Sequence, residues 1–353
     1  MKSSLYTLLT LFGLILFLSS CSTPKMFTTL DILRPAQVTF APEVNSILLV
    51  DNSLPQPSDI GHYVQKIDKE QTNVELKFDS AAIFCTASLR EALEGKAFFN
   101  NVHLAQNKTN VTDSFYKITP LTKEIVKTLC GIYHVDAVVS LDRLLSADKI
   151  TEYMIANDNI EYGDDLDVKI FTDWSIHYPT DKPVTYTQFT DSFTWESSSA
   201  NINKAADDLP KRYDALVDAS LLTGSNIADR FIPHWEKEDR YFFTPRNKTM
   251  REAMDSVVVR NWKAAIGLWK KAAENSRSQK LKFQSYNNMA IASEILGDLN
   301  NAQKYCDEAI NSYPYTQFYS NEFDNEFYQL TSYQKELKRR VGEIKLLKKQ
   351  LGN

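Results

Sequence analysis

The chain has 353 residues, a formal net charge of −5 and 43% hydrophobic residues, which is typical of a folded protein with two cores. Because the charge is so close to balance, the chain has no broad basic field for nucleic acid. Only 10 glycines are present, and neither Gly-x-Gly-x-x-Gly nor a Walker-type Gly-Lys-Ser/Thr occurs, so we expect no nucleotide and no cofactor.

Residues 1–20 have the pattern of a secretory signal, with a lysine near the start and an apolar run that is short for a membrane span. A serine pair directly before Cys21 resembles the lipobox of bacterial lipoproteins. The resemblance implies that residues 1–20 are removed, that Cys21 carries the lipid and that residues 21–30 form a tether. An ordinary secretory peptide followed by a chance cysteine is the alternative.

Residues 31–243 are predicted to form an α/β domain with a mixed sheet. The branched apolar run Ser46 to Val50 is typical of a strand covered on both faces. A helix from Asp79 to Gly95 and a strand in 98–105 follow. The next helix starts at Thr119 and Pro120, and a strand in 135–141 comes after it. The buried face of this second helix is predicted to contain Leu121, Ile125, Leu129 and Ile132. Because strands and helices alternate, we expect parallel strands joined by crossover helices.

The pattern changes after residue 141. Apolar and polar residues alternate strictly over 168–178, which predicts a half-buried antiparallel strand, with partner strands in 150–155 and 184–195. A helical pattern over 202–227 follows, in which Pro210 marks a kink or a start. The acidic residues Asp158, Glu161, Asp164, Asp165 and Asp167 precede the alternating strand and lack the spacing of a calcium loop, so we expect a solvated hairpin tip.

Two stretches carry a resemblance to known families. The segment 133–139, Tyr-His-Val-Asp-Ala-Val-Val, follows a predicted helix, and with the strand order it resembles the α/β domain of the curli-secretion lipoprotein family and the amino-terminal domain of TolB-like proteins. That resemblance implies a fold only. The closing residues Pro233, Trp235, Arg240, Tyr241 and Phe242 resemble those of uncharacterised Bacteroidetes lipoproteins, which join such a domain to helical repeats and have no settled activity.

Residues 246–353 show internal repetition. A tetratricopeptide-like period of about 34 residues, counted from Phe283, places Tyr286, Met289, Ala290, Gly297, Ala302, Cys306, Ala309 and Pro314 at its marked positions. An earlier copy contains Ala253, Trp262, Ala265, Trp269 and Ala272. The predicted fold class is therefore α+β, with the mixed-sheet domain followed by an all-α tetratricopeptide-like repeat domain. A generic bundle of helical hairpins is the alternative to the repeats. Heptad-like apolar spacing from Leu330 to Leu351 predicts a capping helix, with a coiled-coil contact as the alternative.

The last predicted helix has a basic side, and a solvated face explains it more simply than contact with anionic lipid or an acidic partner. This side contains Lys335, Lys338, Arg339, Arg340, Lys345, Lys348 and Lys349. Signs of chemistry are few. The chain lacks His-Glu-x-x-His and Gly-x-Ser-x-Gly, so we expect no metal and no catalytic residue. Cys85, Cys130 and Cys306 are expected to be buried thiols, with a disulfide between Cys85 and Cys130 as the alternative.

These features favour a lipid-anchored, non-enzymatic cell-envelope protein on the periplasmic face of the outer membrane. We expect the α/β domain near the membrane and a concave groove of repeats that binds an envelope protein or peptide. The candidate binding residues in the groove are Trp262, Trp269, Tyr286 and Asn287.

Two alternatives remain open. The first is an envelope hydrolase with its site around Asp51, Asn52 and Asp142, which follow the parallel strands. The second is an oligomerising module related to secretion, as the curli-secretion resemblance implies.

Overall fold

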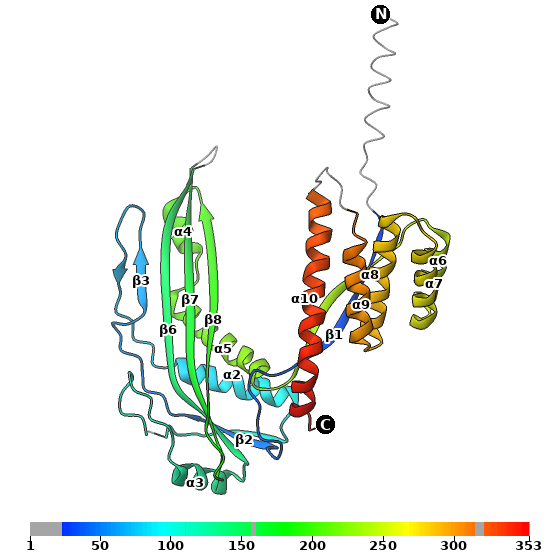
Figure 1. Ribbon diagram of the computed structural model, residues 1–353. Helices are drawn as coiled ribbons and strands as arrows, with labels where there is room; N and C mark the ends of the chain where they lie inside the picture. Colours follow the sequence, from blue (N-terminus) through cyan, green and yellow to red (C-terminus); the bar gives the residue numbers. More distant parts are fainter. Residues whose placement is uncertain (1–22, 110, 157–159, 315–320, 353) are drawn as a thin grey trace, which may run out of the picture. The chain divides into compact units, whose positions relative to one another are not determined.

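The computed structural model describes residues 23–109, 111–156, 160–314 and 321–352 (Figure 1). Cys21 and the predicted signal peptide lie outside the described residues. The chain divides into two compact units. The sheet unit contains Pro35–His234 and Lys349–Asn353, and the helical unit contains the residues up to Arg34 and Trp235–Lys348. The chain therefore has a sheet domain in its amino-terminal half and a helical carboxyl-terminal region.

The sheet unit has one mixed sheet of seven strands within the described residues. These are β2 (Ser46–Asp51), β3 (His62–Gln65), β4 (Thr72–Asn73), β5 (Asn101–Leu104), β6 (Ala137–Ala156), β7 (Ile160–His177) and β8 (Thr185–Ser199). β2 pairs in parallel with β5 and β6, as the alternation of strands and helices predicts. β6, β7 and β8 form an antiparallel meander of long strands (Figure 1).

The meander differs from the prediction in two places. Residues 150–155 do not form a separate strand, because β6 continues from Ala137 through a register shift between Leu141 and Arg143. The acidic residues Glu161, Asp164, Asp165 and Asp167 lie in β7 rather than in a hairpin loop, and Asp158 lies outside the described residues.

The two faces of β2 are covered by different helices. α2 (Ala81–Lys96) and α5 (Arg212–Phe231) pack on the face of Ile47 and Leu49, and α3 (Lys123–Tyr133) packs on the opposite face. The short helix α4 (Ile202–Asp208) packs on β7 and β8. α2 and α5 pack against each other, and Gly224 makes this possible because a Cβ there would lie 2.2 Å from the carbonyl oxygen of Cys85. Cys85 and Cys130 are buried free thiols in separate clusters, on α2 and α3, so they do not form the alternative disulfide.

α3 begins three residues later than the proline signal predicts. The side chain of Thr122 accepts a hydrogen bond from the amide of Ile125 and caps the helix, so Pro120 lies before it. Val126 and Cys130 are buried in one cluster with Leu121, and Ile125 and Leu129 pack against it. Of the four residues predicted to be buried, Ile132 is the exception, at 65% exposed. α4 and α5 are separate helices on either side of Pro210.

The helical unit contains five helices within the described residues. They are α6 (Lys248–Val258), α7 (Trp262–Glu274), α8 (Gln279–Ile295), α9 (Leu299–Asn311) and α10 (Asn321–Gln350). Asn247, Asn261, Ser278 and Asp298 cap the first four, each accepting from an amide of the first turn. α6, α7, α8 and α9 pack consecutively, with the small residues Ala265, Ala290 and Ala302 fully buried at their contacts.

Two strands complete the helical unit, β1 (Lys25–Arg34) and β9 (His234–Phe243), which pair with each other. Residues 25–30 were predicted as part of a tether, and β9 was predicted as the end of the α/β domain. Both predictions were wrong, because the pairing of β1 with β9 joins distant parts of the chain. β1 and β9 lie about 200 residues apart in the chain, as the hydrogen bond from Thr29 to Asp239 shows, so no local pattern reveals the pairing.

Candidate functional site

The predicted groove of the helical unit is occupied by β9. The ring of Phe242 stacks on the rings of Trp262 and Trp269, with centroid distances of 6.1 and 5.6 Å. Trp269 is fully buried and Trp262 is half-buried. Two of the four predicted binding residues therefore contact a strand of the same chain.

Asparagines on α8 hold the main chain of β9. Asn288 donates through Nδ2 to the carbonyl of Phe243 and accepts through Oδ1 from the amide of Phe243, both at 2.8 Å. Asn287 donates to the carbonyl of Tyr241 at 3.2 Å. Tyr286 is half-buried between the two apolar clusters of the unit. The structure thus brings the four predicted residues together around β9, and sequence reasoning missed Asn288, which lies directly beside Asn287.

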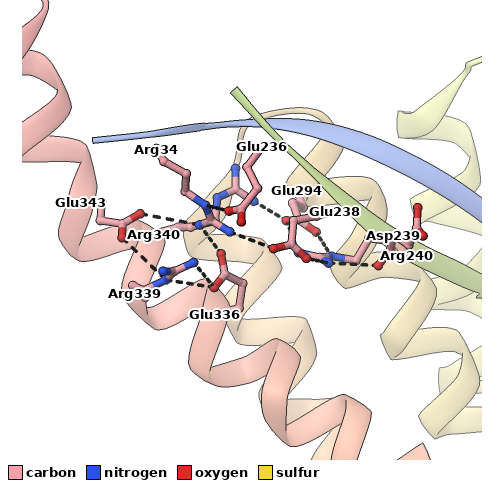
Figure 2. A network of polar contacts seen from close by, with 10 residues as sticks. All are labelled: Arg34, Glu236, Glu238, Asp239, Arg240, Glu294, Glu336, Arg339, Arg340 and Glu343. Atoms are coloured by element: carbon pink, nitrogen blue, oxygen red, sulfur yellow. Dashed lines mark hydrogen bonds and ion pairs between the residues drawn. The ribbon is translucent and has the colours of Figure 1, made fainter. Parts of the chain in front are cut away.

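A network of ion pairs fastens β1 and β9 to α8 and α10 (Figure 2). Arg34, whose side chain is 5% exposed, binds Glu236 at 2.5 Å and Glu238 at 3.0 Å. It also contacts Glu336 on α10. Burial lowers the pKa of Arg34, but hydrogen bonds from its guanidinium to these carboxylates outweigh burial and raise the pKa.

Arg240 of β9 forms the second centre of this network. Its guanidinium binds both carboxylate oxygens of Glu294 on α8, at 3.0 and 3.2 Å. Arg340 of α10 contacts the same carboxylate, and Tyr333 donates to it at 2.8 Å. Burial and the Glu294 carboxylate raise the pKa of Tyr333 well above its usual range, so its hydroxyl stays protonated and donates.

A cavity of about 500 Å³ opens beside the network, between the β1–β9 ribbon, α8 and α10. Its walls include Tyr241 and Tyr333, and Phe27 and Tyr328 are 70% and 71% exposed. The ammonium of Lys25 lies 4.4 Å from the centre of the Tyr241 ring and 2.9 Å from Glu326. The cavity therefore combines exposed aromatic rings with walls held by ion pairs. We refer to it as the ribbon cavity.

The residues of the predicted hydrolase site lie together. Asp51 is the last residue of β2, Asn52 follows it, and Asp142 lies within β6 at the register shift. Asp142 is 2% exposed and accepts from Asn52 at 3.2 Å and from Ser175 at 2.6 Å. Asp51 pairs with Lys108 at 2.9 Å. His177 is 2.7 Å from Ser175, and burial lowers its pKa despite the opposing charge of Asp142. These partners occupy both carboxylates.

The described residues contain no group of three or more His, Cys, Asp or Glu side chains that could bind a metal ion. None of the helices in this part of the chain is both long and apolar enough to cross a membrane.

Comparison with known proteins identifies a family for most of the sheet unit. The family described as "Domain of unknown function (DUF8603)" matches residues 44–243. The chain belongs to this family. A second family, "Domain of unknown function (DUF6340)", matches residues 251–339, from α6 into α10. No match was found among curated proteins.

Among solved structures, the chain is similar to the hypothetical protein CT253 from Chlamydia trachomatis. The two sequences are 11% identical, the match covers 53% of this chain and 88% of that chain, and the TM-score is 0.17.

Proposed function

We propose that this chain is a lipid-anchored, non-enzymatic protein of the cell envelope that binds another envelope protein through its helical unit. The lipobox-like residues before Cys21 support the anchor. The absence of an acidic run or an aspartate after Cys21 supports the periplasmic face of the outer membrane. The tetratricopeptide-like interpretation draws support from the consecutive antiparallel hairpins and from the small residues Ala265, Ala290 and Ala302 at their contacts.

One observation carries the proposed binding function: the ribbon cavity leaves Phe27 and Tyr328 exposed on a framework of buried ion pairs. Exposed aromatic side chains on a rigid support are typical of the few residues that dominate protein interfaces. The binding surface therefore differs in part from the predicted one, since Asn287 lines the ribbon cavity but Trp262, Trp269 and Tyr286 do not. β9 already occupies the groove around Trp262 and Trp269, so the partner contacts the ribbon cavity instead.

The test is chemical crosslinking in intact cells, followed by purification of the lipoprotein and identification of its partners. The variant is Phe27→Ser with Tyr328→Ser. The matched control is Tyr116→Ser with Tyr186→Ser, which removes two exposed tyrosines from the sheet unit. We expect the same partner with the wild type and the control, and its loss with the variant. A partner retained by the variant and lost by the control would place binding on the sheet unit.

The hydrolase alternative gains no support from the geometry, because Ser175 is fully buried and Asp142 is almost so. The oligomerising alternative draws on a different observation. Within the described residues β8 pairs only with β7, which leaves one edge of a 15-residue strand without a partner strand. Such an edge can pair with another chain. Native mass spectrometry tests this alternative, and a monomer at micromolar concentration would remove it.

A further inference from the structure

The chain enters the helical unit at one defined end. The side chain of Thr23 accepts from Gln284 of α8 at 2.8 Å, and the carbonyl of Pro24 accepts from both the amide and the hydroxyl of Thr244 at 2.9 Å. β1 thus begins beside the first turns of α8 (Figure 1). The position at Cys21 is two residues before Thr23, which spans at most about 7 Å of extended chain.

Three helix termini lie at the end of the helical unit where β1 begins. α6 begins four residues after Thr244, and α8 begins five residues before Gln284. α7 lies between them in sequence, packs against both and is joined to each by a short loop, so it ends where α8 begins. We call the surface formed by these three helix ends the entry surface.

The entry surface is basic. Arg246 precedes α6, Lys248 and Arg251 lie in its first turn, and Arg277 lies between α7 and α8. All four side chains are exposed. Three carboxylates near this end have lysine neighbours, with Glu252 at 3.9 Å from Lys248, Glu274 at 3.9 Å from Lys270 and Glu326 at 2.9 Å from Lys25. Of the four basic residues, Lys248 thus has a carboxylate neighbour, and Arg246, Arg251 and Arg277 do not take part in these three contacts.

The basic side of α10 differs from the entry surface in both position and pairing. Arg339 binds Glu336 at 2.7 Å, and Arg340 contacts Glu294, so part of its charge serves the ion-pair network. Glu326, which pairs with Lys25, lies near the start of α10. At about 1.5 Å per residue, Lys345 is roughly 28 Å further along the helix.

We propose that the entry surface binds the anionic headgroups of phospholipids and that the helical unit is the part of the chain that lies against the bilayer. This inference rests on the proposed lipid anchor at Cys21. An anchor within two residues of Thr23 brings this end of the unit to the membrane surface, where several basic side chains act together on anionic lipid. It replaces the expectation that the α/β domain lies near the membrane.

The test uses the chain from Ser22 to Asn353, which lacks the lipid, so that binding reports the surface alone. Sedimentation with vesicles of phosphatidylethanolamine and phosphatidylglycerol is compared with vesicles of phosphatidylcholine. The variant carries Arg246→Gln, Lys248→Gln, Arg251→Gln and Arg277→Gln. The matched control carries Lys335→Gln, Lys338→Gln, Lys345→Gln and Lys348→Gln, which removes the same charge from exposed positions on α10.

We expect binding to the anionic vesicles alone, weakening as salt rises, since exposed charges are screened. The variant should lose at least about tenfold in binding, and the control should stay within about twofold of the wild type. Equal losses in both proteins, or no binding by the wild type, would overturn the inference. Neither result bears on the anchor, because labelling of the full chain with a fatty acid, with Cys21→Ser as the control, tests it separately.

Discussion

The two units of this protein both bury polar groups, but they do so differently. In the sheet unit the carboxylate of Asp142 is held by short side chains, Ser140, Ser175 and Asn52, within one sheet and its flanking loop. In the helical unit long charged side chains from four elements meet, and Arg34 and Glu336 lie 302 residues apart. The contacts of Asp142 thus join residues at most 90 apart in the chain, while the ion pairs of Arg34 join residues up to 302 apart. The sheet unit also buries a charged pair, Asp148 with Arg212.

Removing Glu294 should have the largest effect and would show how strongly the helical unit depends on its ion pairs. Glu294→Gln removes the buried carboxylate that pairs with Arg240 and Arg340, and leaves Arg240 with Glu238 at 3.2 Å as its remaining charged partner. Breaking a buried pair in this way costs about 3–5 kcal/mol. Urea unfolding measures the loss. The control Glu94→Gln breaks the exposed pair with Arg90 and should change stability by less than about 1 kcal/mol. Similar values for both would contradict the account.

Asn288→Ala should come next, because it removes both hydrogen bonds to the main chain of Phe243 in a fully buried position. Leaving a buried amide and carbonyl without partners costs about 2–4 kcal/mol together. The control is Asn300→Ala at an exposed position of α9. A loss below about 1 kcal/mol would show that β9 is not held by its main chain.

Gly224→Ala tests the packing of the sheet unit, again by urea unfolding. The new methyl group would meet the carbonyl oxygen of Cys85, so α2 and α5 must separate, at a cost of about 1–3 kcal/mol. Gly95→Ala is the matched control, since a Cβ there has no atom within 4 Å, and it should be neutral or slightly stabilising. If both variants are equally stable, the close approach of the two helices does not matter energetically.

The smallest expected effect is a pH dependence in the sheet unit. Burial lowers the pKa of His177 below its ordinary value of 6.5, so the unfolded state binds its proton first as the pH falls. The contribution of neutral His177 to the free energy of unfolding is therefore present above pH 6.5 and is lost as the pH falls below it. His177→Gln should flatten this decline relative to the wild type in urea unfolding across that range. If the free energy of unfolding of the variant depends on pH as steeply as that of the wild type, protonation of His177 does not cause the decline.

The sequence predicted the parts of the fold that short patterns determine. The run Ser46–Val50 and the alternation over 168–178 appear as strands at those places, because burial on two faces or one face leaves a local signature. The start of α3 was wrong, since the side chain of Thr122, and not the ring of Pro120, decides where the helix begins. A proline signals a helix start only to within a turn.

The site was only partly predictable, for a different physical reason. Repeat spacing placed Trp262, Trp269, Tyr286 and Asn287 on one surface, and they do lie together. The spacing could not show that β9 would occupy that surface, because the contact depends on stacking by Phe242 and on pairing with β1. The sequence also did not predict that Phe27 would line the ribbon cavity, because residues 21–30 carry no local pattern and β1 is positioned by its pairing with β9.

Hydrogen exchange at the amide of Phe243 tests the central claim most directly, which is that the groove of the helical unit holds the chain's own strand. The claim predicts that this amide, bonded to Asn288 in a buried position, is among the slowest in the unit and exchanges only when the unit unfolds. The Asn288→Ala variant should expose it. Fast exchange at Phe243 in the wild type, with the amides of α8 still protected, would mean that the groove is open and available to a partner.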